Sequence, residues 1–248
     1  MYLEGVAEQV PSPPAGAEGT RGGGFVVGLN SDFSEFVVVR TADMEWQPSP
    51  AAGVWRKRLD LCGGTESGRV TSIVRYDAGS RFPSHEHPDG EEILVLEGIF
   101  ADEHGSYSAG TYLLNPEGFC HAPRSDEGCV LFVKLRQYPG SDRGHRVVDS
   151  NTAAWQQSEP PGREVLPLYD EAGHRESMRL VRLAPGTRVT EHEHPGGEEV
   201  YVIAGSIADA HGSYEQGSWL RFPDGSRHQP HSDEGCTLYV KTGHLWDL

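Results

Sequence analysis

A repeated pattern of histidines, a glutamate, glycines and a proline constrains the fold of this chain more than any other feature. The first copy reads Gly79-x5-His85-x-His87-x3-Glu91-x6-Gly98, followed by Gly110-x5-Pro116-x-Gly118-x2-His121. The second copy, 107 residues later, reads Gly186-x5-His192-x-His194-x3-Glu198-x6-Gly205, followed by Gly217-x5-Pro223-x-Gly225-x2-His228. Three imidazoles and one carboxylate form a ligand set for a divalent metal. The repeat therefore predicts two units of one fold, each with a metal site.

The similarity between the halves extends well beyond these residues. Val38–Trp46 matches Val147–Trp155, and Asp102–Tyr107 matches Asp209–Tyr214. Short apolar or alternating runs, such as 70–76, 93–96, 112–114 and 130–133, are separated by Gly, Pro and Asp-Glu turns, and no long stretch has helical periodicity. The 31 Gly and 17 Pro also suit a turn-rich β protein. We therefore expect an all-β chain of two double-stranded β-helix (jelly-roll) barrels.

Three segments are expected along the chain. Residues 1–24 are rich in Pro and Gly with few large apolar side chains, which predicts a mobile N-terminal arm. The polar, turn-rich stretch Tyr138–Arg146 is the natural boundary between the units. The first barrel domain is accordingly placed at 25–140 and the second at 141–248.

Composition excludes several classes of partner. A formal net charge of −16 disfavours both nucleic acid and anionic membranes, since phosphate contacts need clustered Lys and Arg. No apolar run is long enough to span a membrane, and the N-terminus lacks the features of a secretory signal. The four cysteines form no CxxC pair and suggest no disulfide framework. A cytoplasmic, reduced protein is the expectation.

Strand geometry explains how the proposed ligands meet. His85 and His87 stand at i and i+2, so they project from one face of a strand, whereas Glu91 opens the next strand after a turn. His121 comes from a strand distant in sequence, which barrel closure can bring to the same pocket. In the second barrel the corresponding ligands are His192, His194, Glu198 and His228.

Other residues near this pattern receive weaker interpretations. Glu92 and Glu199 directly follow the proposed ligands and are expected to face the other way, as supporting or structural groups. Cys120 adjoins His121 and is expected beside the site, with a redox role as the minority hypothesis; Arg227 holds the matching position. The remaining assignments are hairpin positions for His104 and His211, core packing for Cys129 and Cys236, and no role for His145, His174, His231 and His244.

The local sequence resembles the cupin of the ChrR-like family, within the cupin superfamily. The resemblance rests on residues 87–98 (HPDGEEILVLEG), 102–107 (DEHGSY) and 127–134 (EGCVLFVK), and it covers residues 32–248 in two copies. It implies metal ligands at the eight positions named above. The family's anti-sigma-factor members imply zinc, and its oxygenase relatives imply iron(II). The anti-sigma members also carry an N-terminal His-x3-Cys-x2-Cys zinc domain, which this sequence lacks. Ser125 and Ser232 stand where cupins often have Asn.

Two functions follow as hypotheses. The first is an Fe(II)-dependent dioxygenase acting on a small molecule, because the metal would keep open positions for dioxygen and substrate. The alternative is a zinc-binding sensor or regulatory module without catalysis, with a small effector or a regulatory protein as partner. Manganese is a third candidate metal, and one barrel could be active while the other is structural. The oligomeric state is left open, with a homo-oligomer among the options, and no catalytic residue is assigned.

Overall fold

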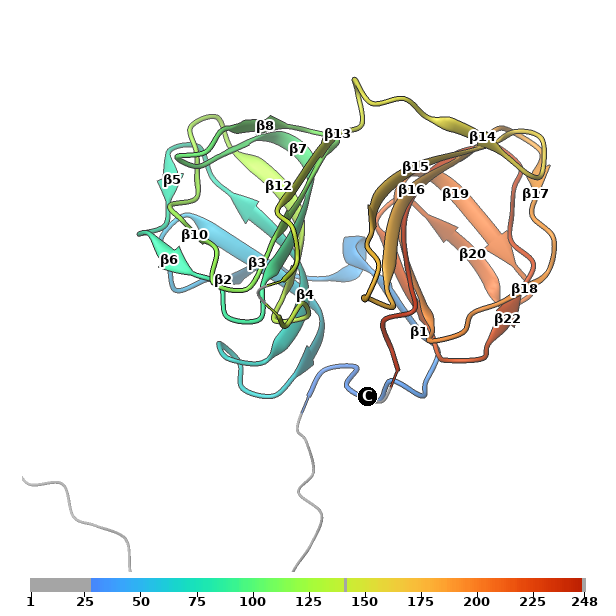
Figure 1. Cartoon of the computed structure of the whole chain (residues 1–248), viewed down its shortest axis with the longest axis horizontal. Helices are drawn as coiled ribbons and strands as arrows, with labels where there is room; N and C mark the ends of the chain where they lie inside the picture. The colour runs from blue at the N-terminus through green and yellow to red at the C-terminus, as the bar shows by residue number, and fades with distance from the viewer. Residues whose placement is uncertain (1–27, 141, 247–248) are drawn as a thin grey trace, which may run out of the picture.

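The described part of the chain forms two β-barrels that lie side by side (Figure 1). The computed structural model describes residues 28–140 and 142–246, so the expected arm at 1–24 lies outside them. The only helix in these ranges is the short 3-10 turn η1, Thr41–Asp43. The all-β, two-barrel fold expected from the repeat is therefore confirmed. Among the described residues no helix is long and apolar enough to cross a membrane.

The first barrel is built mainly on one antiparallel sheet of order β13-β9-β7-β12-β4-β3-β2, with β5, β8 and β11 attached to it and the β6–β10 pair beside it. Its strands are β2 (Gln47–Pro48), β3 (Val54–Cys62), β4 (Arg69–Tyr76), β5 (Ser80–Arg81), β6 (His85–Glu86), β7 (Glu91–Ala101), β8 (Ser106–Ser108), β9 (Thr111–Asn115), β10 (Cys120–His121), β11 (Arg124–Ser125), β12 (Cys129–Leu135) and β13 (Arg146–Asp149).

The second barrel repeats this plan, with sheet order β1-β21-β19-β24-β16-β15-β14 and a separate β18–β22 pair. Its strands are β1 (Val37–Arg40), β14 (Gln156–Ser158), β15 (Arg163–Asp170), β16 (Ser177–Leu183), β17 (Thr187–Arg188), β18 (His192–Glu193), β19 (Glu198–Asp209), β20 (Gly212–Glu215), β21 (Ser218–Phe222), β22 (Arg227–His228), β23 (His231–Ser232) and β24 (Cys236–Thr242).

The first strand of each repeat belongs to the other repeat's barrel. Strand β1 pairs with β21, so that Val37 lies opposite Arg221. Its counterpart β13 pairs with β9, so that Arg146 lies opposite Leu114. In Figure 1 the blue β1 accordingly lies with the orange strands of the second barrel. This reciprocal exchange ties the two halves together through backbone hydrogen bonds as well as side-chain packing.

Three apolar cores stabilise the molecule. One fills each barrel, with Ile93 and Leu131 in the first and Val200 and Leu238 in the second. The third lies between the barrels, where Phe132 of β12 stacks on Tyr201 of β19 with ring centroids 5.1 Å apart. A continuous core between two barrels favours one rigid unit over two loosely tethered domains.

The repeated glycines mark places where the backbone has no room for a side chain. Gly98 has φ 71°, and a Cβ there would lie 2.1 Å from the carbonyl oxygen of Gly128. Gly205 has φ 72° and the same 2.1 Å approach to Gly235 O. Both positions lie beside a β-bulge in the pairing with β12 or β24. Only glycine combines this positive φ with such close strand contact.

Candidate metal centres

A short two-stranded pair brings the first and last ligands of each set together. Strand β6 pairs with β10 so that His85 lies directly opposite His121. In the second barrel β18 pairs with β22 and places His192 opposite His228. These histidines are far apart in sequence, yet directly opposite strand residues have Cβ atoms only about 5 Å apart. The expectation that barrel closure would unite them is thus met in both halves.

The second histidine of each set lies in the turn that leads into the long strand. The amide of His87 donates to Phe119 O at 2.9 Å, and the His87 carbonyl accepts from Gly118 N at 3.1 Å. Those bonds clamp the turn onto the loop that carries the last histidine. Glu91 then opens β7, so its side chain returns to the same pocket.

In the first barrel three imidazoles converge with a carboxylate beside them. Nitrogen atoms of His85, His87 and His121 all lie within 4.8 Å of one another. The Nε2 atoms of His87 and His121 are 2.9 Å apart. Glu91 Oε2 lies 3.5 Å from the first of these and 3.4 Å from the second. Imidazole nitrogens that face one another beside a carboxylate are an arrangement that suits the binding of a divalent cation.

The second barrel brings all four expected residues into one cluster. Donor atoms of His192, His194, Glu198 and His228 lie within 4.8 Å of one another. Glu198 Oε2 is 3.4 Å from His194 Nδ1, and its Oε1 is 3.5 Å from His228 Nε2. Nε2 of His194 and Nε2 of His228 are buried without any hydrogen-bond partner among the described residues. Buried polar atoms need a partner, and a metal ion at this cluster would supply one. Both clusters could therefore hold a metal.

An aspartate fixes the last histidine of each set, and the sequence reasoning did not identify it. His121 Nδ1 lies 3.1 Å from Asp102 Oδ2, and His228 Nδ1 lies 3.0 Å from Asp209 Oδ2. A carboxylate in this position orients the ring and leaves the other nitrogen free for a metal. Burial alone would lower the pKa of His121, but the Asp102 hydrogen bond and the Glu91 charge outweigh it and raise that pKa. The available signal was the Asp of the repeated DEHGSY and DAHGSY stretches.

The two carboxylate ligand candidates have different neighbours. Asn115 Nδ2 donates to Glu91 Oε2 at 2.9 Å, whereas the matching residue of the second repeat is Phe222. In the second barrel Arg179 lies 3.8 Å from Glu198. Burial opposes the charge on Glu198, but the hydrogen bond from His194 and nearby positive charges lower its pKa overall. The repeats therefore share the same candidate ligands and differ in what surrounds them.

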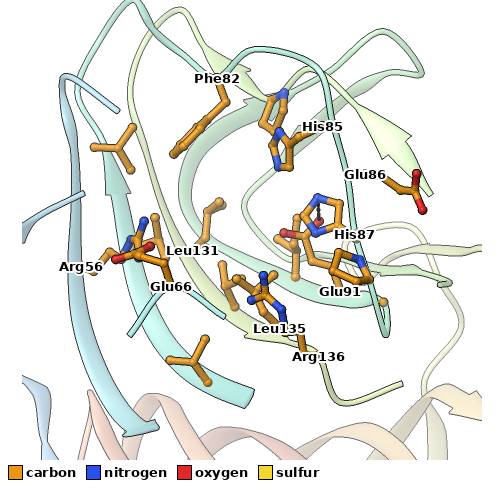
Figure 2. A pocket seen from close by; sticks show the side chains of 18 of the residues that line it. Arg56, Glu66, Phe82, His85, Glu86, His87, Glu91, Leu131, Leu135 and Arg136 are labelled. Carbon is orange, nitrogen blue, oxygen red and sulfur yellow. Dashed lines mark hydrogen bonds and ion pairs between the residues drawn. The ribbon is translucent and has the colours of Figure 1, made fainter. Parts of the chain in front are cut away.

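The cavities beside the two clusters differ in size. A cavity of about 190 Å³ in the first barrel is lined by His85, His87 and Glu91 and by mostly apolar side chains. Figure 2 shows these three residues on one side of the space, opposite Arg56, Glu66 and Leu131. The cavity beside His192, Glu198 and His228 measures about 50 Å³. Only the first has room for more than one or two water molecules.

Residues with weaker sequence interpretations lie near the first cluster but outside it. Cys120 is exposed, with its Sγ 3.2 Å from Ser84 Oγ, and it pairs across the strands with Glu86. His104 Nε2 lies 3.3 Å from Cys120 O. His145 stacks on Phe119 at 4.9 Å. These contacts place Cys120 beside the site, as strand alternation indicated.

The remaining repeat-related residues serve the structure. Glu92 and Glu199 face away from the clusters and are buried, and each accepts a hydrogen bond from a residue of the opposite barrel. Cys129 and Cys236 are buried free thiols in the barrel cores. Among the unassigned histidines, His244 is buried with its Nε2 3.2 Å from Glu199 Oε2. His174 lies 3.8 Å from Asp142, His211 contacts the Phe36 ring, and His231 belongs to β23.

Comparisons with solved structures find the same fold in other proteins. A proposed dioxygenase from Nostoc punctiforme is 16% identical with a TM-score of 0.70, covering 87% of this chain and 85% of its own. A proposed glyoxylate-induced protein from Pseudomonas aeruginosa is 11% identical with a TM-score of 0.67, covering 84% and 88%. A mutant oxalate decarboxylase from Bacillus subtilis is 15% identical with a TM-score of 0.59, covering 83% and 76%. At these identities the likeness concerns the fold alone.

A family model settles the relationship. No curated protein sequence matches the chain. The model of the ChrR cupin-like domain matches twice, over residues 34–139 and 143–246. Each match contains one complete set of the proposed ligands, and together they span nearly all of the described residues. The chain is a bicupin that belongs to the ChrR cupin-like family.

Proposed function

We propose that this bicupin is a non-haem metal-dependent oxygenase that transforms a small molecule in its first barrel. The observation that carries the proposal is the apolar cavity of about 190 Å³ that ends at His85, His87 and Glu91. A metal held there would face enclosed space instead of protein, which an enzyme needs and a purely structural site does not. The resemblance of the fold to a proposed dioxygenase is compatible with this reaction class.

Different residues of the chain would have different roles at such a site. His85, His87, His121 and Glu91 would hold the ion, and Asp102 would keep the His121 ring in the ligating orientation. Iron(II) bound to three imidazoles and a carboxylate would supply redox chemistry and free positions for dioxygen and substrate. The apolar walls would exclude bulk water and orient the substrate.

Metal analysis and oxygen uptake test the proposal with a matched pair of variants. His87→Ala and His194→Ala each remove one ligand from one barrel, so each should reduce the bound metal by one ion per chain. Only His87→Ala should abolish oxygen consumption by the iron-loaded protein with diketone- or catechol-like substrates. Recovery of zinc alone, with no oxygen uptake across a broad panel, would count against an oxygenase.

The second barrel favours a different role for its own site. Its four donors form one cluster, and the adjoining cavity measures only about 50 Å³. Four protein ligands around zinc are typical of structural or responsive sites. We infer a division of labour in which this ion stabilises the fold or senses its environment. Chelation that removes only this ion should lower the melting temperature without stopping oxygen uptake. Elemental analysis would also distinguish iron, zinc and manganese.

A further inference from the structure

Arg136 occupies a backbone position that suits glycine. It follows β12 directly and has φ 58°, a left-handed conformation that L residues with side chains rarely adopt. The matching residue of the second repeat is Gly243, with φ 73°. Both make the same backbone hydrogen bond, Arg136 N to Gly90 O and Gly243 N to Gly197 O, each 3.1 Å long. The first barrel thus carries an arginine where the fold itself calls for glycine, and strained positions of this kind cluster at functional sites.

The Arg136 side chain lines the cavity beside the first metal cluster. Figure 2 shows it at the lower end of the space, between Glu66 and Glu91. Its charge is one of the influences that lower the pKa of His87, after the larger effect of burial. No hydrogen bond or ion pair of its guanidinium is found among residues 28–140 and 142–246. A guanidinium without a protein partner at the edge of a cavity is available to an anionic ligand.

The other charged groups of this cavity already have partners or face elsewhere. Arg56 donates to Glu66 at 2.9 Å and to Ser49 at 2.8 Å. Glu91 accepts from Asn115 and adjoins the histidines. Glu86 is exposed and points away from the space in Figure 2. Arg136 is therefore the one lining arginine that forms no ion pair with a carboxylate of the described residues.

Size and wall chemistry restrict what could supply the missing acceptor. The cavity of about 190 Å³ corresponds to roughly six water volumes. Its walls away from the metal ligands are mainly aliphatic and aromatic: Val54, Val70, Val74, Ile93, Phe100 and Leu131. A ligand that matches both features is small, with an apolar body and a single anionic group.

We propose that the first barrel binds a small carboxylic acid with an apolar body, its carboxylate paired with Arg136. A guanidinium fork matches the two oxygens of a carboxylate, and such charge-assisted pairs are among the stronger hydrogen bonds in proteins. The reaction of such an acid rests on the proposed function, whereas its binding to Arg136 is a separate proposal.

The second barrel lacks an equivalent site. At Gly243 an added Cβ would lie 2.5 Å from the backbone oxygen of Arg175, so no side chain fits there. The arginines that line its smaller cavity already have partners, since Arg163 Nη1 donates to Ser158 Oγ at 2.5 Å and Arg179 lies 3.8 Å from Glu198. Selectivity for the acid should therefore belong to the first barrel alone.

Calorimetric titration of the zinc-loaded protein tests the binding without turnover. Butanoate and benzoate are compared with the neutral isosteres butanamide and benzamide. In wild type each acid should bind more tightly than its amide. Arg136→Gly should weaken the acids by about 10–100-fold and leave the amides unchanged, with Arg136→Lys intermediate. Because glycine relaxes the backbone, Arg136→Gly should also raise the melting temperature by about 2–4 °C.

Asp89→Gly is the matched control for the backbone effect. Asp89 has φ 55°, its counterpart Gly196 has φ 73°, and it does not line the cavity. This variant should gain stability and keep its affinity for the acids. Equal acid affinity in wild type and Arg136→Gly would overturn the proposal, as would acid binding that depends on the metal and not on Arg136. Oxygen uptake by iron-loaded protein is scored separately, so the oxygenase proposal can fail while acid binding stands, or the reverse.

Discussion

Asp102 and Asp209 show how much a single residue outside the ligand set can control. Each accepts from the last histidine of its set and so fixes which ring nitrogen faces the cluster. Asp102→Asn should weaken metal binding in the first barrel by about 10–100-fold, because the amide no longer favours the ligating tautomer. Competition with a chromophoric chelator measures this affinity.

The reciprocal variant provides the control for that prediction. Asp209→Asn should weaken the second site by a similar factor and leave the first unchanged. A loss at both sites from either variant would mean that the aspartates act on the fold and not on their own histidines.

His244 gives a pH dependence whose sign can be worked out. Burial lowers its pKa to about 3, from an ordinary value of 6.5. Between these values the unfolded chain binds a proton that the folded chain does not, so this residue makes the free energy of unfolding fall as pH falls. From pH 7 to pH 5 the loss is about 2 kcal/mol.

The sequence itself suggests the variant that removes this effect. Gln137 holds the matching position of the first repeat, so His244→Gln introduces the residue that the fold already accepts there. Urea unfolding of the metal-free protein at both pH values should show a smaller pH dependence in the variant. An unchanged dependence would show that His244 ionises in the folded state as readily as in the unfolded chain.

What the sequence could reveal at this scale depends on periodicity. The i, i+2 spacing and the duplication were enough to group the histidines correctly, because strand alternation fixes which side chains share a face. The contact of Asp102 with His121 was not predicted because a turn brings the two residues together, and turns have no periodicity. The unusual backbone of Arg136 was not predicted because a positive φ cannot be inferred from the residue type when the residue is not glycine. The ligand candidates were thus predictable, and the groups that tune them were not.

At the scale of elements, the exchanged strands β1 and β13 are the main departure from two independent barrels. Coexpression of residues 1–140 with residues 141–248 should yield a stable complex that contains both, whereas either segment alone should be unfolded or aggregated. Each segment lacks one edge strand of its own barrel and carries one that the other needs. Size-exclusion chromatography and circular dichroism of the two segments, alone and together, measure this. Independent folding of either segment would refute it.

The same strands mark the limit of sequence-based prediction for the fold. The apolar runs at 70–76, 93–96, 112–114 and 130–133 do lie within β4, β7, β9 and β12. Local patterning identifies such strands because one or both faces are buried. It does not identify the partner of β1, because a strand pairs equally well with either equivalent edge. Only the packing of the barrels against each other decides between them.

At the scale of the whole molecule, two buried ion pairs join the barrels across their shared core. Lys134 Nζ donates to Glu199 at 2.6 Å, and in the reciprocal position Lys241 Nζ lies 3.6 Å from Glu92. All four side chains are buried. Removing one partner of a buried pair leaves an uncompensated charge, which commonly costs about 3–5 kcal/mol. Equivalent substitutions need not cost the same, however.

Lys134→Met should be the more destabilising of the matched variants Lys134→Met and Lys241→Met. Although burial opposes its charge, the Lys134 ammonium is the strongest influence that holds the pKa of Glu199 well below normal, so Lys134→Met removes the main stabilisation of that carboxylate. Burial already raises the pKa of Glu92, which can take up a proton when Lys241 is lost. The deficit of Lys241→Met should therefore shrink as pH falls. Denaturant unfolding at several pH values measures both deficits, and equal, pH-independent losses would contradict this account.

The exchange of β1 also sets an order of events during synthesis. On the ribosome, β1 emerges early, but its partner β21 ends only at Phe222. At about 5–20 residues per second the nascent chain waits roughly 10–40 s before this pairing can form. Throughout that interval the strand has unsatisfied backbone groups, and an unpaired edge can recruit another chain. Another nascent copy of the chain could pair with β1 before its own β21 is made. Slow or crowded translation should therefore favour intertwined dimers in which each molecule completes a barrel of the other.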